Sequence, residues 1–134
     1  MGRRGGVIVL DTHAWVWWLT EDARLSRAVR DVADREAVGV AAISCFEVAY
    51  LARNGRIELD RDIRDWVRTA LAGDGVRLLP LDGEIATEAA LLAGDRFPGD
   101  PADRIIYATA RRYGALLATK DRRLRAHDRQ HTFW

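Results

Sequence analysis

The chain lacks the residues that would cross-link it or let it bind zinc through sulfur. Its 134 residues include one cysteine, Cys45, which excludes an internal disulfide and a cysteine zinc cluster. It also lacks a segment resembling a signal peptide or a membrane span, because the apolar stretch near its start has the length of one strand and ends at Asp11. We therefore expect a protein of the reducing cytoplasm with no membrane partner.

Net charge is almost absent as well. Lys and Arg together number 21, Asp and Glu number 20, and the formal net charge is +1, so a nucleic acid would have to be bound by a local patch. Apolar residues, by contrast, make up 49% of the chain. This is enough for the core of one domain, and the chain is too short for two. We predict a single domain over residues 1–134.

Short apolar runs alternate with amphipathic helical patterns. Strand-like runs occupy residues 7–10, 38–43, 76–80 and 115–118, and a short terminal strand is predicted within 130–134. The first run has no polar alternation, which is typical of a strand covered on both faces in a parallel sheet. Pro80 favours a sheet edge for the third run. The pattern predicts an α/β fold with three layers, α/β/α, around a central, mostly parallel twisted sheet of four to five strands.

Several acidic residues lie where helices are expected to begin, and each has a structural explanation. Asp11 suits a helix N-cap as well as it suits a ligand. Ser44 followed three residues later by Glu47 predicts a capping box. The remaining acids of this kind are Asp100, Asp103 and Asp121.

Taken together, these acids indicate more than helix capping. The carboxyl ends of parallel strands meet at one edge of a sheet, so the acids that follow the strands are expected in one crevice. Asp103 reaches that crevice only if the loop predicted over residues 94–99, which we interpret as a flexible rim, crosses the top of the sheet. Carboxylates gathered in one place repel one another, and a hard divalent cation such as Mg²⁺ relieves this repulsion.

Four short motifs cover the chain from the first strand to the last helix. They are Leu10-Asp11-Thr12-His13-Ala14, Ser44-x-x-Glu47, Asp100-Pro101-x-Asp103-Arg104 and Thr119-Lys120-Asp121. In this order and at these spacings they resemble the PIN-domain ribonucleases, and among them the VapC toxins of toxin–antitoxin pairs. The resemblance implies a PIN-like fold, Mg²⁺-dependent endonucleolytic hydrolysis of RNA by metal-activated water, and neutralisation by a cognate antitoxin. Mn²⁺ would be a substitute ion.

The resemblance also assigns roles to individual residues. Carried over by position, the catalytic and metal-binding acids are Asp11, Glu47, Asp103 and Asp121. Asp100 is either an additional ligand or a helix cap. Thr12 and Thr119 would orient carboxylates or water through hydrogen bonds. We interpret His13 as a first-turn helix residue, because a metal ion activates water without the help of a histidine base.

Basic residues are concentrated near the C-terminus. From residue 104 to residue 134 the chain carries eight of them, Arg104, Arg111, Arg112, Lys120, Arg122, Arg123, Arg125 and Arg129, against the two acids Asp121 and Asp128. An ordinary solvated helix face would have the same composition. For an RNA substrate we predict contacts from Arg104, Lys120, Arg122 and Arg123.

Two other functions stay open. A receiver-like signalling domain is also a small parallel α/β module, but it would place a pair of acids by its first strand and a phosphate-accepting Asp after its third, where this chain has Leu79-Pro80. A catalytically inactive PIN-like scaffold would bind a partner without cutting RNA, and the four intact acids argue against it.

A protein-binding surface is expected on the helices near the N-terminus. The helix expected over residues 13–20 and its neighbour through Val32 are strongly apolar and include the tryptophans Trp15, Trp17 and Trp18. Such aromatics fill cores or anchor interfaces. We hypothesise that the antitoxin binds in the groove that these helices border, with Trp17 exposed there, and that a homodimer forms on other helical faces.

Overall fold

The computed structural model describes residues 6–92 and 97–134. Its centre is a five-stranded sheet in the order β3-β2-β1-β4-β5, in which every pairing is parallel. The strands are β1 (Val7–Leu10), β2 (Ala37–Ala41), β3 (Val76–Leu79), β4 (Leu116–Ala118) and β5 (Thr132–Phe133). The predicted parallel sheet, the edge position of the third strand and the short terminal strand are all confirmed.

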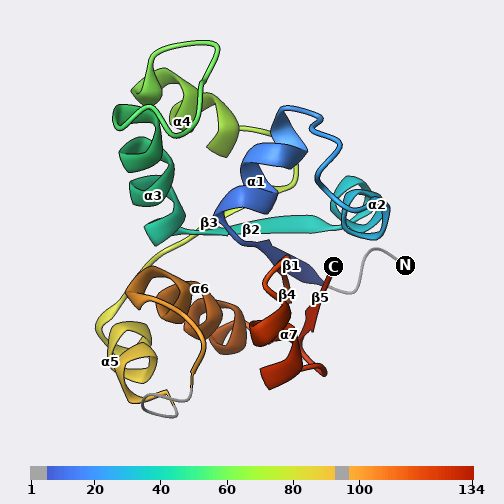
Figure 1. The fold of residues 1–134 in the computed structure, drawn as a ribbon, viewed down its shortest axis with the longest axis vertical. Helices are drawn as coiled ribbons and strands as arrows, with labels where there is room; N and C mark the ends of the chain where they lie inside the picture. The colour runs from blue at the N-terminus through green and yellow to red at the C-terminus, as the bar shows by residue number, and fades with distance from the viewer. Residues whose placement is uncertain (1–5, 93–96) are drawn as a thin grey trace.

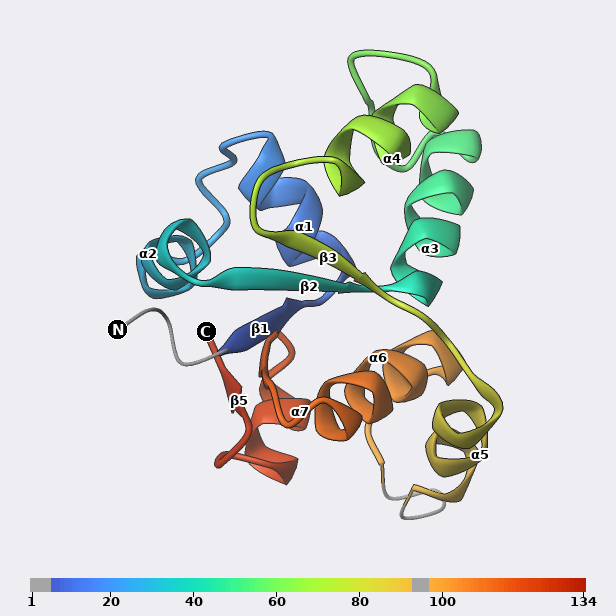
Figure 2. The same ribbon diagram turned by 180° about the vertical axis from the view of Figure 1, so that it is seen from behind.

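Helices cover both faces of this sheet (Figures 1 and 2). They are α1 (Thr12–Leu19), α2 (Arg27–Arg35), α3 (Ala42–Arg53), α4 (Ile63–Leu71), α5 (Gly83–Leu91), α6 (Pro101–Arg112) and α7 (Arg122–His127). In Figure 1 the first four lie above the sheet, and the last three lie below it. The three-layer α/β/α architecture is therefore as predicted.

The side-chain alternation of β1 explains the two layers of core. Ile8 and Leu10 pack with α1, α2 and α4 on one face, whereas Val9 packs with α6 and α7 on the other. Because successive residues of a strand point to opposite faces, a short run without polar residues serves both layers at once. Val9 and Leu10 are accordingly fully buried.

Some boundaries differ from the prediction. The second strand ends at Ala41 and not at residue 43, because α3 begins at Ala42. The N-cap of α4 is Asp62, so this helix begins at Ile63. The apolar run continues from β2 into the first residues of α3, so apolar character alone does not locate the boundary between them.

The loop predicted as a flexible rim lies partly outside the described residues, which exclude 93–96. The part that is described is core: Phe97 is buried, and its ring centroid lies 5.1 Å from that of Tyr107 and 5.3 Å from that of His127. For Phe97 the prediction of a rim is therefore wrong, because its aromatic ring fills the space between α6 and α7.

The strand order places a switch in chain direction next to β1. The chain builds β2 and β3 on one side of β1, then crosses to add β4 and β5 on the other side. In open α/β sheets the crevice at the carboxyl ends of the strands flanking such a switch is the usual ligand site. Asp11 and Asp121 follow the two strands that flank this switch, β1 and β4.

No helix in residues 6–92 and 97–134 is long and apolar enough to cross a membrane.

Candidate active site

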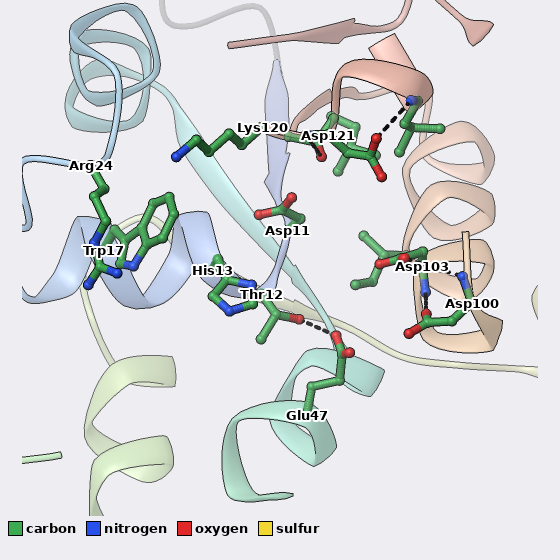
Figure 3. A pocket seen from close by; sticks show the side chains of 14 residues that line it. Asp11, Thr12, His13, Trp17, Arg24, Glu47, Asp100, Asp103, Lys120 and Asp121 are labelled. Atoms are coloured by element: carbon green, nitrogen blue, oxygen red, sulfur yellow. Dashed lines mark hydrogen bonds between the residues drawn. The ribbon is translucent and has the colours of Figure 1, made fainter. Parts of the chain in front are cut away.

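A cavity of about 470 Å³ opens at the carboxyl ends of the strands, and Figure 3 shows it from close by. All five acids singled out from the sequence line it: Asp11, Glu47, Asp100, Asp103 and Asp121. They come from the end of β1, from α3, from the start of α6 and from the end of β4, segments that lie far apart in the sequence. The predicted convergence of these acids is confirmed. We call this cavity the acidic pocket.

Asp11 both caps a helix and faces the pocket. It is the N-cap of α1, and its Oδ1 accepts a hydrogen bond of 2.9 Å from the backbone N–H of Ala14. Burial raises the pKa of Asp11, and the nearby charge of Asp121 raises it further. Capping therefore uses one oxygen of Asp11 and does not exclude a ligand role.

Ser44 and Glu47 do not form the predicted capping box. The N-cap of α3 is Ala41, three residues earlier than the motif required, and it makes no side-chain cap. The Thr12 hydroxyl instead lies 3.1 Å from the buried Ser44 Oγ and hydrogen-bonds to Glu47 Oε1. Since a hydroxyl carries one hydrogen, Thr12 donates to the Glu47 carboxylate and accepts from Ser44. The same two residues thus join α3 to α1.

This contact positions Glu47 at the pocket (Figure 3). Burial raises the pKa of Glu47, and the neighbouring carboxylates of Asp100 and Asp11 raise it further, while the hydrogen bond from Thr12 lowers it. The buried Thr12 hydroxyl thus points to a pocket carboxylate, the contact that an orienting role needs, and that role stays a prediction.

The opposite side of the pocket is the first turn of α6. Asp100 and Asp103 form a true capping box: Asp103 N–H donates to Asp100 Oδ1 at 2.9 Å, and Asp100 N–H donates to Asp103 Oδ2 at 3.3 Å. Gly99 makes room for it, because a Cβ at residue 99 would lie 2.7 Å from Asp103 Cβ. Burial and the charges of Asp100 and Glu47 raise the pKa of Asp103 to about 7. The helix does start at the predicted edge of the sheet.

Asp121 completes the ring of acids from the side of β4. It is the N-cap of α7 and accepts hydrogen bonds from the backbone N–H groups of Arg123, at 2.9 Å, and Leu124, at 3.2 Å. Thr119 is buried, and its Oγ1 accepts from the Asp121 N–H at 3.2 Å. A hydrogen bond from Thr119 also lowers the pKa of Asp11. Thr119 therefore lies between two of the acids, as its predicted role requires.

The donor set suits a hard divalent cation. All five acids offer carboxylate oxygens, and burial together with mutual repulsion raises the pKa of Asp11, Glu47 and Asp103. An ion between them would relieve that repulsion. Among residues 6–92 and 97–134, however, no three acid, histidine or cysteine side chains are close enough to form a ready-made metal cluster. The acids line a common cavity whose ligands would move together on binding.

The predicted RNA-binding residues separate into three groups. Lys120 lines the pocket. Arg122 and Arg123 are exposed on the first turn of α7 and do not line it. The Arg104 guanidinium donates to the backbone carbonyls of Ala89, at 3.1 Å, and Leu92, at 3.2 Å. Arg104 therefore fixes the end of α5 against α6, and this internal use disfavours it as an RNA contact.

Three pocket residues, Arg24, Trp17 and His13, were not assigned to the site from the sequence. Arg24, in the loop after α1, matches no motif, and only the folded loop brings it to the pocket. Trp17 was assigned to an exposed partner surface, yet it is 9% exposed and lines the pocket. The one available signal was that Trp17 lies four residues after His13, on the same face of α1, where the two ring centroids are 5.6 Å apart. His13 also lines the pocket.

Known protein families identify this arrangement. A family model described as the PIN domain matches residues 8–130. The chain belongs to the PIN-domain family. PIN nucleases generally use divalent metal ions, in agreement with the donor set. Membership also excludes the receiver-like alternative, because the PIN model matches nearly the whole chain.

Individual PIN proteins are similar to this chain in sequence or in fold. It is 43% identical over 121 residues to a protein of Mycobacterium tuberculosis (strain ATCC 25618 / H37Rv) named Ribonuclease VapC22, covering 90% of this chain and 91% of that protein. A chain from a toxin-antitoxin complex of Klebsiella pneumoniae superposes with a TM-score of 0.70 at 18% identity, covering 95% of this chain and 96% of the other. VapBC2 from Rickettsia felis, bound to a DNA fragment from its promoter, gives a TM-score of 0.70 at 11% identity, covering 95% and 97%. At these low identities, the two structures show the common PIN fold.

Proposed function

We propose that this protein is a Mg²⁺-dependent endoribonuclease, the toxin of a toxin–antitoxin pair, built as one PIN nuclease domain. The name of its 43% identical relative, Ribonuclease VapC22, supports an RNA substrate. The observation that carries the proposal is the acidic pocket itself, in which five carboxylates from distant segments line one cavity next to the switch in strand order. Such a concentration of negative charge would repel RNA unless a cation were bound.

Asp11, Glu47, Asp103 and Asp121 are the proposed catalytic acids and would hold the ion, with Asp100 as an additional ligand. Mg²⁺ is proposed, with Mn²⁺ as a substitute, because both prefer oxygen ligands and the acids supply nothing else. A divalent ion in such a site supplies positive charge to the scissile phosphate and activates water for attack on phosphorus.

The chain's own residues prepare the pocket for that chemistry. Thr12 fixes one oxygen of Glu47 and leaves the other available, while backbone N–H groups fix one oxygen each of Asp11 and Asp121. Each acid is thus held by one oxygen in a set orientation, which lowers the cost of ordering it around a ligand.

A cognate antitoxin is the proposed protein partner, as the toxin-antitoxin complex with the same fold suggests. The structure changes where it can bind, since Trp17 is buried and cannot anchor it. Phe46 and Tyr50 on α3 are 63% and 56% exposed and stack at 5.9 Å. Such exposed aromatics suit a protein interface, either with the antitoxin or in the homodimer that we also propose.

The decisive experiment compares two helix caps. Purified protein is incubated with labelled RNA in Mg²⁺, with and without a chelator, together with Asp11→Asn and Asp82→Asn variants. Both acids cap helices and Asn preserves a cap, but Asp82 does not line the pocket. We expect chelation to abolish cleavage, Asp11→Asn to reduce it by at least about 100-fold, and Asp82→Asn to leave it unchanged. Full cleavage by Asp11→Asn would contradict the proposal, and an intact wild-type protein that cuts no RNA would indicate a binding scaffold.

A further inference from the structure

The cavity that holds the acids has a second side of opposite character. His13, Trp17, Arg24 and Lys120 line the same 470 Å³ space as the carboxylates, and Figure 3 shows them grouped across Asp11 from Asp103 and Asp100. Arg24 and Lys120 come from the loop after α1 and from the end of β4, so the fold and not the sequence brings the two cations together.

Trp17 is what the two cations share. The Arg24 Cζ lies 4.8 Å from the centroid of the Trp17 ring, and the Lys120 Nζ lies 5.4 Å from it. Both distances are within the range of cation–π attraction, which is strongest for tryptophan. Trp17 is itself fixed, because it is 9% exposed and its ring packs edge-on against Trp134 at 6.1 Å. The indole is thus a rigid base on which two flexible cationic side chains are ordered.

Arg24 keeps binding capacity despite its ion pair. Its Nε and Nη2 donate to the two oxygens of Asp22 at 3.0 and 2.8 Å, an arrangement that holds the pKa of Asp22 down at about 2. A guanidinium carries five N–H donors, so three remain after this bidentate contact. The Arg24 side chain is 64% exposed, and those donors can reach a ligand in the pocket.

Lys120, unlike Arg24, forms no ion pair with a carboxylate of the described residues. It is exposed. It also lies between Thr119 and Asp121 in the sequence, so its backbone is fixed by the same segment that delivers an acid to the pocket.

We propose that Arg24 and Lys120, ordered on the Trp17 ring, bind the RNA phosphate that neighbours the scissile one. This inference rests on the proposed ribonuclease function. An RNA strand brings its phosphates in sequence, so a strand whose scissile phosphate lies at the acids presents the next phosphate at the rim of the same cavity. The Lys120 ammonium and the Arg24 guanidinium face that rim, and both groups bind phosphate oxygens.

The arrangement of charge around the cavity favours RNA over a protein as the occupant. The cations and the acids line one continuous space, and a polyanion held at the acids by a divalent ion passes both groups with complementary charge at each. A carboxylate of a protein partner would satisfy the cations alone. Binding of the antitoxin at this place is therefore an outcome that the test must separate.

The test uses RNA binding without cleavage. In an Asp11→Asn background, affinity for a single-stranded oligoribonucleotide is measured by fluorescence anisotropy over a range of salt concentrations, for Lys120→Met, Arg24→Met and Arg56→Met. Each phosphate contact on a single strand contributes about 0.7 to the slope of log affinity against log salt. We expect Lys120→Met and Arg24→Met each to reduce the slope by about 0.7, and Arg56→Met, whose residue lies beyond α3 outside the pocket, to leave it unchanged.

Trp17 is a positioning residue in this scheme, and its test is a rescue. Trp17→Phe keeps an aromatic face for the cations, whereas Trp17→Leu fills space without one. In the cleaving protein we expect Lys120→Met and Trp17→Leu to raise KM by about 10-fold with kcat within about twofold of wild type, the pattern of lost ground-state binding. Trp17→Phe and Lys120→Arg should restore most of the affinity. A loss of fold in Trp17→Leu would lower the melting temperature, which circular dichroism measures, and the two cation variants test the proposal without it.

The outcomes distinguish a failure of the phosphate subsite from a failure of the ribonuclease function. If wild type cleaves RNA but the cation variants keep its salt slope and KM, the phosphate subsite is wrong and the ribonuclease proposal stands. If the cation variants weaken antitoxin binding and leave RNA binding unchanged, the pair belongs to the protein interface and the subsite is again wrong. If wild type binds no RNA and cleaves none with Mg²⁺ or Mn²⁺, the proposed function fails first.

Discussion

The two walls of the acidic pocket differ in how they hold their carboxylates. On the wall formed by α1 and α3, the α1–α3 wall, a buried threonine of one helix fixes Glu47 of another helix 35 residues away in sequence. On the wall formed by the first turn of α6, the α6 wall, the side chains of Asp100 and Asp103 each accept from the other's backbone N–H within one turn. The α1–α3 wall is thus held by a tertiary contact, whereas the α6 wall is held by hydrogen bonds within one helical turn.

This difference has an electrostatic counterpart. Thr12 donates to Glu47 and partly offsets the cost of burying its charge. Asp103 accepts one backbone N–H, and burial together with the charges of Asp100 and Glu47 raises its pKa to about 7. The α1–α3 wall is therefore prepared for a charged ligand shell, whereas the α6 wall is completed when a cation neutralises it.

Among changes that leave every acid in place, the largest expected effect comes from breaking the α1–α3 wall. Thr12→Val keeps the shape of the side chain and removes the hydroxyl that orients Glu47 and bonds Ser44. We expect affinity for the divalent ion and RNA cleavage to fall by about 10- to 100-fold, which is the usual cost of losing a hydrogen bond to a metal ligand. Titration calorimetry with Mn²⁺ and cleavage assays measure the two quantities.

Thr109→Val is the matched control for this variant. Thr109 is as deeply buried as Thr12, but its hydroxyl donates to the carbonyl of Ile105 in its own helix, away from the acids. Both variants should lower the free energy of unfolding by about 1 kcal/mol, and only Thr12→Val should weaken ion binding. Equal losses of activity in the two would show that Thr12 acts through stability alone.

The same comparison explains which parts of the site the sequence could reveal. The α6 wall could be predicted because it depends on local sequence alone: Asp100, Pro101 and Asp103 form a helix start in any context. The α1–α3 wall was misread because Ser44 and Glu47 have the spacing of a local capping box, and only the packing of α3 against α1 sends both side chains to Thr12. Arg24 could not be found at all, since its place depends on the path of a loop.

The fold was more predictable than the site for a related reason. A continuous apolar run such as Val7–Leu10 is buried on both faces in nearly every arrangement available to it, so it reports the parallel sheet directly. Apolar residues do not report where an element stops, as the early start of α3 shows. Nor do they separate core from interface: Trp17, which we predicted to be exposed for a partner, is buried beside the acids.

The pH dependence of stability tests the α6 wall through Asp103, whose pKa is raised. An acid whose pKa is about 7 when folded and near 4 when unfolded binds more protons in the folded state between those values, so the free energy of unfolding falls as the pH rises from about 4 to about 7. Glu47 and Asp11, whose pKa values are also raised, act in the same direction. In metal-free buffer, we expect Asp103→Asn to raise the melting temperature relative to wild type by about 2–4 °C at pH 7.5 and by less at pH 5.

Asp65→Asn is the control for general charge removal. Asp65 lies in the first turn of α4, with a 61% exposed side chain and an ion pair to Arg68 that is also exposed. It should change the melting temperature equally at both pH values, by little. Saturating Mg²⁺ should abolish the advantage of Asp103→Asn at pH 7.5, because a bound ion stabilises the ionised wild-type acid. A variant that is no more stable than wild type at pH 7.5 would show that Asp103 is not strained by its neighbours.

The smallest expected effect decides the role of Asp100. Asn is as good an N-cap as Asp, so Asp100→Asn keeps the hydrogen bond to Asp103 N–H and removes one negative charge from the rim, where Asp100 is exposed. If the α6 wall needs Asp100 chiefly as a cap, cleavage at saturating Mg²⁺ should change by less than about threefold, since an exposed charge contributes little. Asp100→Ala removes the cap as well and should destabilise the protein by about 1 kcal/mol. Measuring cleavage over a Mg²⁺ titration separates the two roles: a tenfold higher requirement for Mg²⁺ in Asp100→Asn, with unchanged stability, would make Asp100 a ligand and give the α6 wall two metal-binding acids in place of one.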